Sequence, residues 1–128
     1  SELFTAWVAL SDVNVNSGPM RFIRGSHKWG NLDAGDFFGQ DLDDLRENIK
    51  IPEGAHWIEE PAILKPGGVS CHDRRTLHGS GPNTSSDSRR SFAVHMRTEN
   101  SESKGNLREG LTEYIDDYSI CPVIFGGI

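Results

Sequence analysis

The segment Thr76–Phe92, TLHGSGPNTSSDSRRSF, carries a histidine near its start and an arginine pair near its end. Glycine, proline, asparagine and serine in residues 79–83 favour turns and exclude a helix interior there. After the turns, apolar residues at 92, 94 and 96 alternate with small or polar residues at 91, 93 and 95. This period of two predicts a strand with one apolar face and one polar face.

Arg89 has the parity of Ser91 and His95, so the pattern places it on the polar face of this strand. A guanidinium among small and polar groups needs an anionic partner, and its fork of donors suits a carboxylate bound through two hydrogen bonds. Arg90 has the opposite parity and is expected to point outward. A solvated basic pair is the alternative interpretation of Arg89 and Arg90.

Histidine is the other residue type here that supports such chemistry, and the chain has five. A histidine is more often structural than a metal ligand, so spacing must support any further role. His72 and His78 lie six positions apart and share parity along an extended segment. His27 follows a turn, and His56 is expected at the surface or at a strand edge. From the residues alone, the roles of His27 and His72 stay open.

Several short strands must position these side chains. Pro61 interrupts one of them, which indicates an edge strand or a bulge. Apolar or alternating segments predict strands at residues 3–10, 20–24, 57–64 and 69–72, besides the strand after Arg89.

Leu42, Leu45 and Ile49 recur at helical spacing behind an acidic start, which predicts one short helix from Leu42 to Ile49. Residues 28–40 and the polar stretch after Asn100 are expected to be loops. Short strands, turns rich in Gly and Pro, and one small helix favour a mostly β fold, a β-sandwich or jelly roll.

The 128 residues suit a single domain, residues 1–128, with ordinary soluble composition: 35% hydrophobic and 25% charged. A net charge of −6 without a basic stripe argues against a nucleic-acid partner. The apolar runs are too short to predict a membrane span or a signal peptide. Cys71 and Cys121 match no metal or disulfide spacing, so we expect buried free thiols and a cytoplasmic protein.

The chain resembles the phytanoyl-CoA dioxygenase family of Fe(II)- and 2-oxoglutarate-dependent oxygenases. The resemblance implies a double-stranded β-helix, the cupin-like form of the jelly roll, and an enzyme that couples 2-oxoglutarate decarboxylation to hydroxylation of a small organic substrate. Three stretches carry it in the family's order: AWVALSDVNVNSGPMRFIRGSHKWG (6–30), LKPGGVSCHDRRTLHGSGPNTSSDSRRSF (64–92) and ICPVIFGG (120–127).

By this resemblance, His78 is a ligand of Fe(II) and Arg89 binds the distal carboxylate of 2-oxoglutarate. Ser91, on the same strand face, would donate its hydroxyl to that carboxylate. Trp7 would lie near the cosubstrate pocket, although a tryptophan in a strand can equally be a core residue. The resemblance assigns no residue of this chain as a catalytic acid or base.

Two further positions match the family less specifically. His27 would lie close to the metal, in its surroundings rather than on it. Asn83 would hold the turn of its loop rather than touch substrate.

The H-x-D motif that supplies the other two iron ligands in this family is absent, because none of the five histidines has Asp or Glu two positions later. We expect the motif to lie upstream, which makes this chain the C-terminal portion of such a domain, truncated before its metal-bearing strand. One imidazole holds Fe(II) poorly against water, so the chain alone is expected to bind little iron and to be inactive.

Two functions from different classes stay open. The first is an oxygenase in the parent protein, acting on a small molecule. The second is a metal-free jelly-roll module that binds a small molecule or associates with itself. Open strand edges and the apolar side chains of Leu3 to Leu10 predict a homo-oligomer, a dimer. We expect neither nucleic acid nor membrane as a partner.

Overall fold

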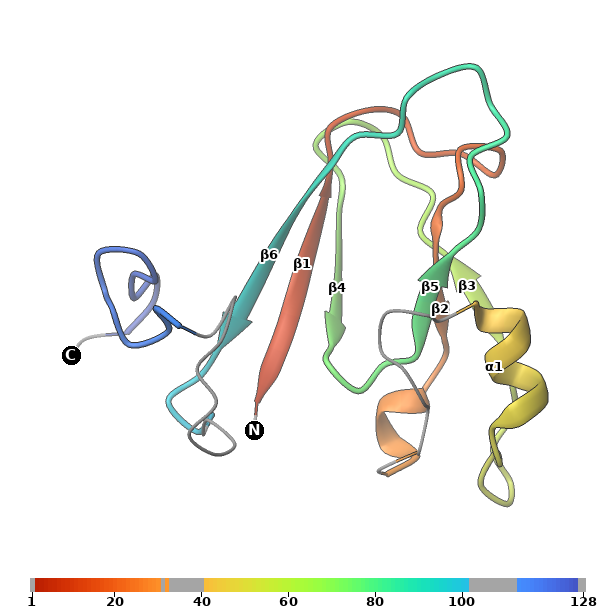
Figure 1. Ribbon diagram of the computed structural model, residues 1–128, viewed down its shortest axis with the longest axis horizontal. Coiled ribbons are helices and arrows are strands. Elements are labelled where there is room, and N and C mark those ends of the chain that lie inside the picture. The colour runs from red at the N-terminus through yellow and green to blue at the C-terminus, as the bar shows by residue number, and fades with distance from the viewer. Residues whose placement is uncertain (1, 31, 33–40, 102–112, 127–128) are drawn as a thin grey trace.

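A computed structural model of the chain describes residues 2–30, 32, 41–101 and 113–126. Figure 1 shows strands β6, β1 and β4 on one side, strands β5, β2 and β3 on the other, and the helix α1 beyond them. In chain order the elements are β1 (Leu3–Ala9), β2 (Met20–Ile23), the 3-10 helix η1 (Ser26–Lys28), α1 (Leu42–Asn48), β3 (Glu59–Pro61), β4 (Val69–Asp73), β5 (His78–Ser80) and β6 (Ser91–Arg97).

The described strands form two antiparallel sheets, ordered β4-β1-β6 and β3-β2-β5. We call them the first and the second sheet. The chain alternates between them, because β1, β4 and β6 lie in the first and β2, β3 and β5 in the second. Such alternation is typical of a jelly roll, whose two sheets face each other. The predicted mostly β fold with one short helix is confirmed.

The first sheet has an inner and an outer face. On β1, the buried residues Thr5, Trp7 and Ala9 alternate with the more exposed Phe4 and Val8. Thr5 pairs with residues 72 and 95, and Trp7 pairs with residues 70 and 93, so these positions share the inner face. The apolar residues of β6 therefore lie on the outer face, as their parity predicts.

A hydrophobic cluster of Ile23, Leu42, Leu45 and Leu77 joins α1 to the second sheet. Leu42 and Leu45 are buried on one side of the helix, as their spacing predicts. The Asp41 side chain accepts a hydrogen bond from the Asp43 N–H and caps the helix start. The helix ends one residue earlier than predicted.

A second cluster of Trp7, Ala9 and Val13 lies beside the first sheet, with Met20 and Leu64 packed against it. Val13 and Leu64 form an isolated bridge. The predicted strand at 57–64 is therefore shorter than expected, because only Glu59–Pro61 pairs with β2 and the chain leaves the ladder after the proline.

The loop after β5 is fastened to the loop before β2. The Thr84 and Ser85 N–H groups both donate to the Asn16 carbonyl, at 2.8 and 3.1 Å. Gly18 has a φ of 65°, and a Cβ there would lie 2.5 Å from the Gly81 carbonyl oxygen. Only glycine allows this close approach. The two loops therefore hold the ends of β2 and β5 together.

Some sequence predictions fail or go untested. Both cysteines are free but exposed, so the expected burial is wrong. Cys71 pairs with Ala6 on the outer face of the first sheet, which the described residues leave largely open. Most of the predicted loops at 28–40 and after Asn100 fall at 31, 33–40 and 102–112, outside the described residues. No helix in the described part of the chain is long and apolar enough to span a membrane.

Candidate functional site

His78 begins β5, where it pairs with Phe22 of β2, and its side chain is partly buried. Its Nδ1 lies 2.7 Å from the Thr76 carbonyl oxygen. A carbonyl only accepts hydrogen bonds, so Nδ1 must carry the proton. The lone pair of the neutral ring is then on Nε2, which is the tautomer that a metal ligand needs.

His72 and His78 come together across the two sheets. Their ring centroids are 4.5 Å apart, although His72 belongs to β4 and His78 to β5. A turn separates the strands, in which the Thr76 N–H donates to the Asp73 carbonyl. The predicted extended segment with shared parity is therefore wrong. The two rings meet because the sheets face each other.

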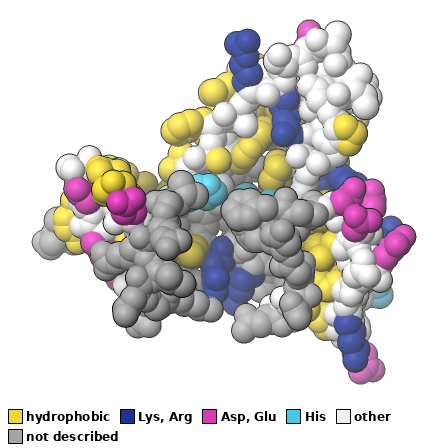
Figure 2. Space-filling model, viewed as in Figure 1, with side chains coloured by type: hydrophobic (Ala, Val, Ile, Leu, Met, Phe, Trp, Pro, Cys, Tyr) yellow, Lys and Arg dark blue, Asp and Glu magenta, His cyan; other side chains and the backbone are white. Residues whose placement is uncertain are grey.

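Phe22 completes an aromatic group with these two histidines. Its ring centroid lies 4.9 Å from that of His72 and 6.1 Å from that of His78. The three rings come from β2, β4 and β5. Figure 2 shows histidine atoms at the molecular surface near the centre of the view, so some histidine side chains are open to solvent.

The His72 imidazole has an unusual environment. Its Nδ1 is buried and has no hydrogen-bond partner in the described part of the chain. Burial lowers the pKa of His72 to about 4, and the imidazoles of His78 and His95 act in the same direction. The ring is therefore neutral at pH 7. Ser70, two residues earlier on the same face, has a buried hydroxyl oxygen that likewise finds no partner among the described residues.

Thr5 lies between two histidines on the inner face. It pairs in register with His72 on one side and His95 on the other. Its Oγ1 is 2.9 Å from Nδ1 of His95, so the hydroxyl engages His95 and leaves His72 without it. The described inner face thus carries a row of His72, Thr5 and His95, with Trp7 in the next row.

Arg89 lies just before β6, and its side chain is partly buried. Its Cζ is 5.8 Å from the centroid of the Trp7 ring, within the range of a cation–π contact. The guanidinium also donates to the Gly18 carbonyl. The expected anionic partner is not found among the described residues, and a guanidinium has five N–H donors, so most of them are free for a ligand.

Arg90 is exposed, as its parity predicts, and its N–H donates to the Ser11 hydroxyl. Ser91 pairs with Ala9, which places it on the inner face near one end of the first sheet. Ser91 is exposed, and its expected contact with a carboxylate stays a prediction.

Trp7 is 6% exposed and belongs to a core cluster, so it is a core residue that also touches Arg89. Asn83 holds its own loop, because it donates to the Asp87 carbonyl at 2.7 Å and accepts from the Ser85 N–H at 2.9 Å. These bonds agree with the turn role expected for Asn83. His27 lies in η1 and is partly buried, and His56 is exposed.

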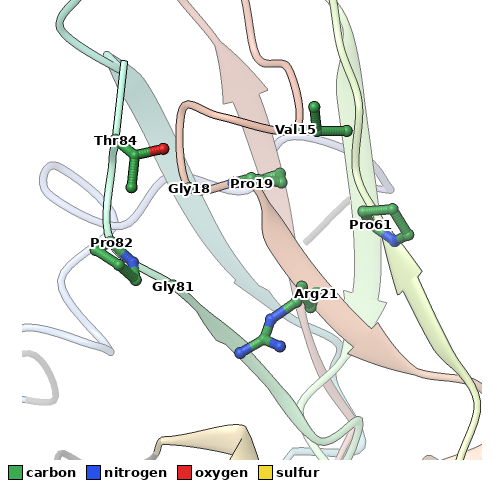
Figure 3. A pocket seen from close by; sticks show the side chains of 8 residues that line it. All are labelled: Val15, Gly18, Pro19, Arg21, Pro61, Gly81, Pro82 and Thr84. Carbon is green, nitrogen blue, oxygen red and sulfur yellow. The ribbon is translucent and has the colours of Figure 1, made fainter. Parts of the chain in front are cut away.

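A pocket of about 380 Å³ lies at the second sheet and includes none of the predicted site residues. Figure 3 shows Arg21 at one end of it, with Pro61 and Pro82 on opposite sides. Arg21 pairs with Pro61 and Gly79, whose parity is opposite to that of Phe22 and His78. The pocket therefore opens away from the histidines.

Sequence reasoning proposed His78, Arg89, Ser91 and Trp7 as site residues. It gave His72, Thr5 and His95 no site role. The parity of His72 in a predicted strand could have placed it on the inner face. Its contact with His78 depends on how two sheets meet, which no spacing shows. Among the described residues, no group of three His, Cys, Asp or Glu side chains could hold a metal ion.

Comparison with known proteins assigns the chain to a family. The profile of the family described as Phytanoyl-CoA dioxygenase (PhyH) matches residues 1–91. Dioxygenase cdmD from Talaromyces verruculosus is 33% identical over 89 residues, which cover 70% of this chain and 24% of that protein. The expected resemblance at 120–127 lies outside the profile match and stays a prediction.

Solved structures agree in fold. The non-heme α-ketoglutarate-dependent carbocyclase SnoK from nogalamycin biosynthesis matches with a TM-score of 0.54 and 29% identity, covering 73% of this chain and 35% of that one. The epimerase SnoN, in complex with Fe3+, α-ketoglutarate and nogalamycin RO, matches with a TM-score of 0.55 and 31% identity, covering 74% and 35%.

The chain thus spans 24% of the length of the curated relative and 35% of each of these two solved structures. The profile match covers most of the chain, and the two sheets agree with the double-stranded β-helix of the solved relatives. The chain therefore belongs to the phytanoyl-CoA dioxygenase (PhyH) family of iron- and 2-oxoglutarate-dependent oxygenases.

Proposed function

We propose that the protein is an iron- and 2-oxoglutarate-dependent oxygenase that hydroxylates a small organic substrate. The observation that carries this proposal is the fixed tautomer of His78, whose Nδ1 is bound at the Thr76 carbonyl. His78 contacts His72, and Arg89 contacts Trp7, so both reach the inner face of the first sheet. One predicted metal ligand and one predicted carboxylate-binding group therefore lie on the same side of that sheet.

The residues present fit iron in part. His78 offers one imidazole nitrogen with a free lone pair, but the described residues contain no complete set of three ligands. An H-x-D pair on another segment would supply the remaining two, as the family pattern implies. We therefore propose that the 128-residue chain alone holds iron weakly.

Iron with 2-oxoglutarate would supply the oxidising power to activate O2 for hydroxylation. The residues of this chain would bind and orient. Arg89 would bind the far carboxylate of 2-oxoglutarate through its free N–H groups, and Ser91 would add a hydroxyl donor. The Trp7 ring contacts the Arg89 guanidinium and would shield it from water on that contact face, because the indole is almost fully buried.

Binding of 2-oxoglutarate tests the role of Arg89. Arg90 is the matched control, because it is the next residue in the chain and its side chain is exposed. Loss of a hydrogen bond to a charged group costs about 1.5–3 kcal/mol, so Arg89→Ala should weaken binding by roughly 10- to 150-fold. Arg90→Ala should leave the affinity unchanged. Calorimetry measures the affinity of both variants, each made in a protein extended upstream by an H-x-D-bearing segment of the family. Equal effects of the two variants would contradict the assignment.

Succinate formation with Fe(II), ascorbate and 2-oxoglutarate tests the activity itself. We expect none from the 128-residue chain and turnover once an H-x-D-bearing segment of the family is joined upstream. Turnover by the short chain would show that the ligand count is wrong. An inactive but folded extended protein, with iron bound, would contradict the proposed reaction.

The outer face of the first sheet favours a second role, self-association. Phe92 is 61% exposed there and pairs with Val8, which pairs in turn with the exposed Val69. We call residues 113–126 the tail. The tail contacts β6, because Arg97 donates to the Ile115 carbonyl at 2.8 Å. Phe125 of that tail is 96% exposed, so the tail does not bury its own apolar groups. We propose that a second copy covers this face, which gives a dimer.

A further inference from the structure

The turn before β2 is held in one conformation by its own side chains. The Ser17 hydroxyl donates to the Asn14 carbonyl at 3.0 Å and accepts from the Asn14 N–H at 2.9 Å. The Asn16 N–H donates to the side-chain carbonyl of Asn14 at 2.9 Å. Ser17 is 3% exposed, so its bonds are shielded from competing water. These bonds fix the backbone that leads into Gly18.

The loop after β5 packs against this turn and leaves no room at Gly18. The Thr84 N–H and the Thr84 hydroxyl both donate to the Asn16 carbonyl, at 2.8 and 3.1 Å. A Cβ at Gly18 would lie 2.5 Å from the Gly81 carbonyl oxygen. That oxygen belongs to the backbone and cannot turn aside as a side chain would. The position of Gly18 is therefore set by both loops.

Arg89 contacts both the first sheet and the loop junction, as we call residues 14–18 and 81–85. Figure 1 shows these two loops side by side, beyond the ends of β2 and β5. The Arg89 guanidinium donates to the Gly18 carbonyl, and its Cζ lies 5.8 Å from the centroid of the Trp7 ring. The bond to Gly18 uses one of the five N–H groups, and the others remain for a ligand.

We propose that Gly18 is a positioning residue for Arg89: the loop junction holds its carbonyl, and the carbonyl directs the guanidinium. A guanidinium is planar, so fixing one N–H also fixes the directions of the other donors. Side chains that are ordered before binding lose less freedom when a ligand arrives, which favours affinity. The inference rests on the proposed function, in which Arg89 binds the far carboxylate of 2-oxoglutarate. It adds no ligand to the metal.

Gly18→Ala tests the loop junction in the protein extended by the H-x-D-bearing segment. The added Cβ must displace one of the two loops, and a φ of 65° disfavours alanine as well. The Gly18 carbonyl then moves, and Arg89 loses its support. We expect the affinity for 2-oxoglutarate to fall about tenfold or more, but no further than in Arg89→Ala, whose side chain is the one positioned. Calorimetry measures the affinity of both variants.

Gly54→Ala is the matched control for this substitution. Gly54 has a φ of 77°, and a Cβ there would meet nothing within 4 Å, so alanine brings the backbone strain without the crowding. The affinity for 2-oxoglutarate should stay within about twofold of the wild type. A loss in Gly54→Ala equal to that in Gly18→Ala would mean that strain in general weakens binding, which overturns the positioning role.

The double variant Gly18→Ala/Arg89→Ala separates positioning from an independent effect. If Gly18 acts through Arg89, the double variant should bind 2-oxoglutarate no more weakly than Arg89→Ala does. If the two losses multiply, Gly18 acts on its own and the inference is wrong.

Nuclear magnetic resonance of the arginine side chains reports the guanidinium directly, in the 128-residue chain and without cosubstrate. The bond to Gly18 should slow rotation of the Arg89 guanidinium and give separate N–H signals, which Arg89→Lys assigns by removing them. Gly18→Ala should merge these signals, and Gly54→Ala should leave them separate. Merged signals in the wild type would show that the guanidinium is not held.

The binding data also separate this inference from the proposed function. If Arg89→Ala weakens binding and Gly18→Ala does not, positioning by Gly18 is wrong and the proposed role of Arg89 stands. If Arg89→Ala leaves the affinity unchanged, the carboxylate assignment of the proposed function fails, and the positioning role fails with it.

Thr84→Val decides if circular dichroism shows that Gly18→Ala does not fold. Valine removes the hydroxyl bond to the Asn16 carbonyl and loosens the loop junction, so the affinity for 2-oxoglutarate should fall about two- to tenfold. Thr84→Ser keeps the hydroxyl and should restore the affinity. An unchanged affinity in Thr84→Val would overturn the inference.

Discussion

The two faces of the first sheet differ in a way that reverses the usual pattern. An antiparallel sheet with one exposed face normally turns its apolar side inward and its polar side to water. Here the face toward the second sheet carries hydroxyl and imidazole groups beside Trp7 and Ala9, while the open face is mostly apolar, with Asp73 at one end. The inner face includes Thr5, Ser70, His72 and His95, and the outer face includes Phe4, Val8, Val69 and Phe92.

The difference supports both proposals, because the inner face would bind a ligand and the outer face would contact a second copy. Polar groups placed between two sheets lose solvation, and an arrangement of that kind is retained where a ligand uses it. An exposed apolar face marks an interaction surface. Trp7 also lies on the inner face, where it is buried in a cluster and contacts Arg89.

The largest effect should come from Trp7. Its side chain is 6% exposed, so Trp7→Ala should lower the free energy of unfolding by about 3–5 kcal/mol. Phe92→Ala, on the outer face, should change it by less than about 0.5 kcal/mol at a concentration where the chain is monomeric. Urea denaturation measures both. Similar losses for the two variants would mean that the faces do not differ in burial.

A smaller, pH-dependent effect should come from His72. Burial lowers the pKa of His72 to about 4 in the folded chain, from an ordinary value of 6.5. The unfolded chain therefore binds the proton first, and folding stability should fall as the pH drops from 6.5 towards 4. Denaturation at several pH values, with a chelator to remove metals, measures the slope.

His72→Phe supplies the comparison for this slope. Other acidic groups cancel when the variant is subtracted from the wild type, so the difference isolates His72. The variant should lose less stability than the wild type between pH 6.5 and pH 4. Parallel profiles would mean that His72 is solvated in the folded chain.

The smallest effect on stability, and a clear effect on assembly, should come from charging the outer face. Phe92→Lys should turn the proposed dimer into a monomer and change the free energy of unfolding of the monomer by less than about 0.5 kcal/mol. Val15→Lys is the matched control, because Val15 is 73% exposed in a loop outside the sheet. Sedimentation equilibrium decides. A wild-type chain that stays monomeric at micromolar concentration would contradict the dimer.

Local pattern predicted much of the fold. Alternation placed β6 and its two faces correctly, apolar content placed β1, and the spacing of Leu42 and Leu45 predicted α1 to within one residue. These features depend on neighbours along the chain, because a strand repeats every two residues and a helix every 3.6. The cysteine prediction failed because residue type indicates average burial, whereas Cys71 lies on a face that the described residues leave largely uncovered.

The sequence by itself indicated the family and the mostly β class, and it proposed four site residues, whose roles stay predictions: Trp7, His78, Arg89 and Ser91. Motif spacing carries those, because each lies in a stretch that the family shares. Only the tertiary structure decided that His72 meets His78 and that Arg89 lies over Trp7. Residues 7 and 89 are far apart in the chain, and a turn breaks the parity between 72 and 78. Contacts between facing sheets depend on how whole layers pack, which no local period records.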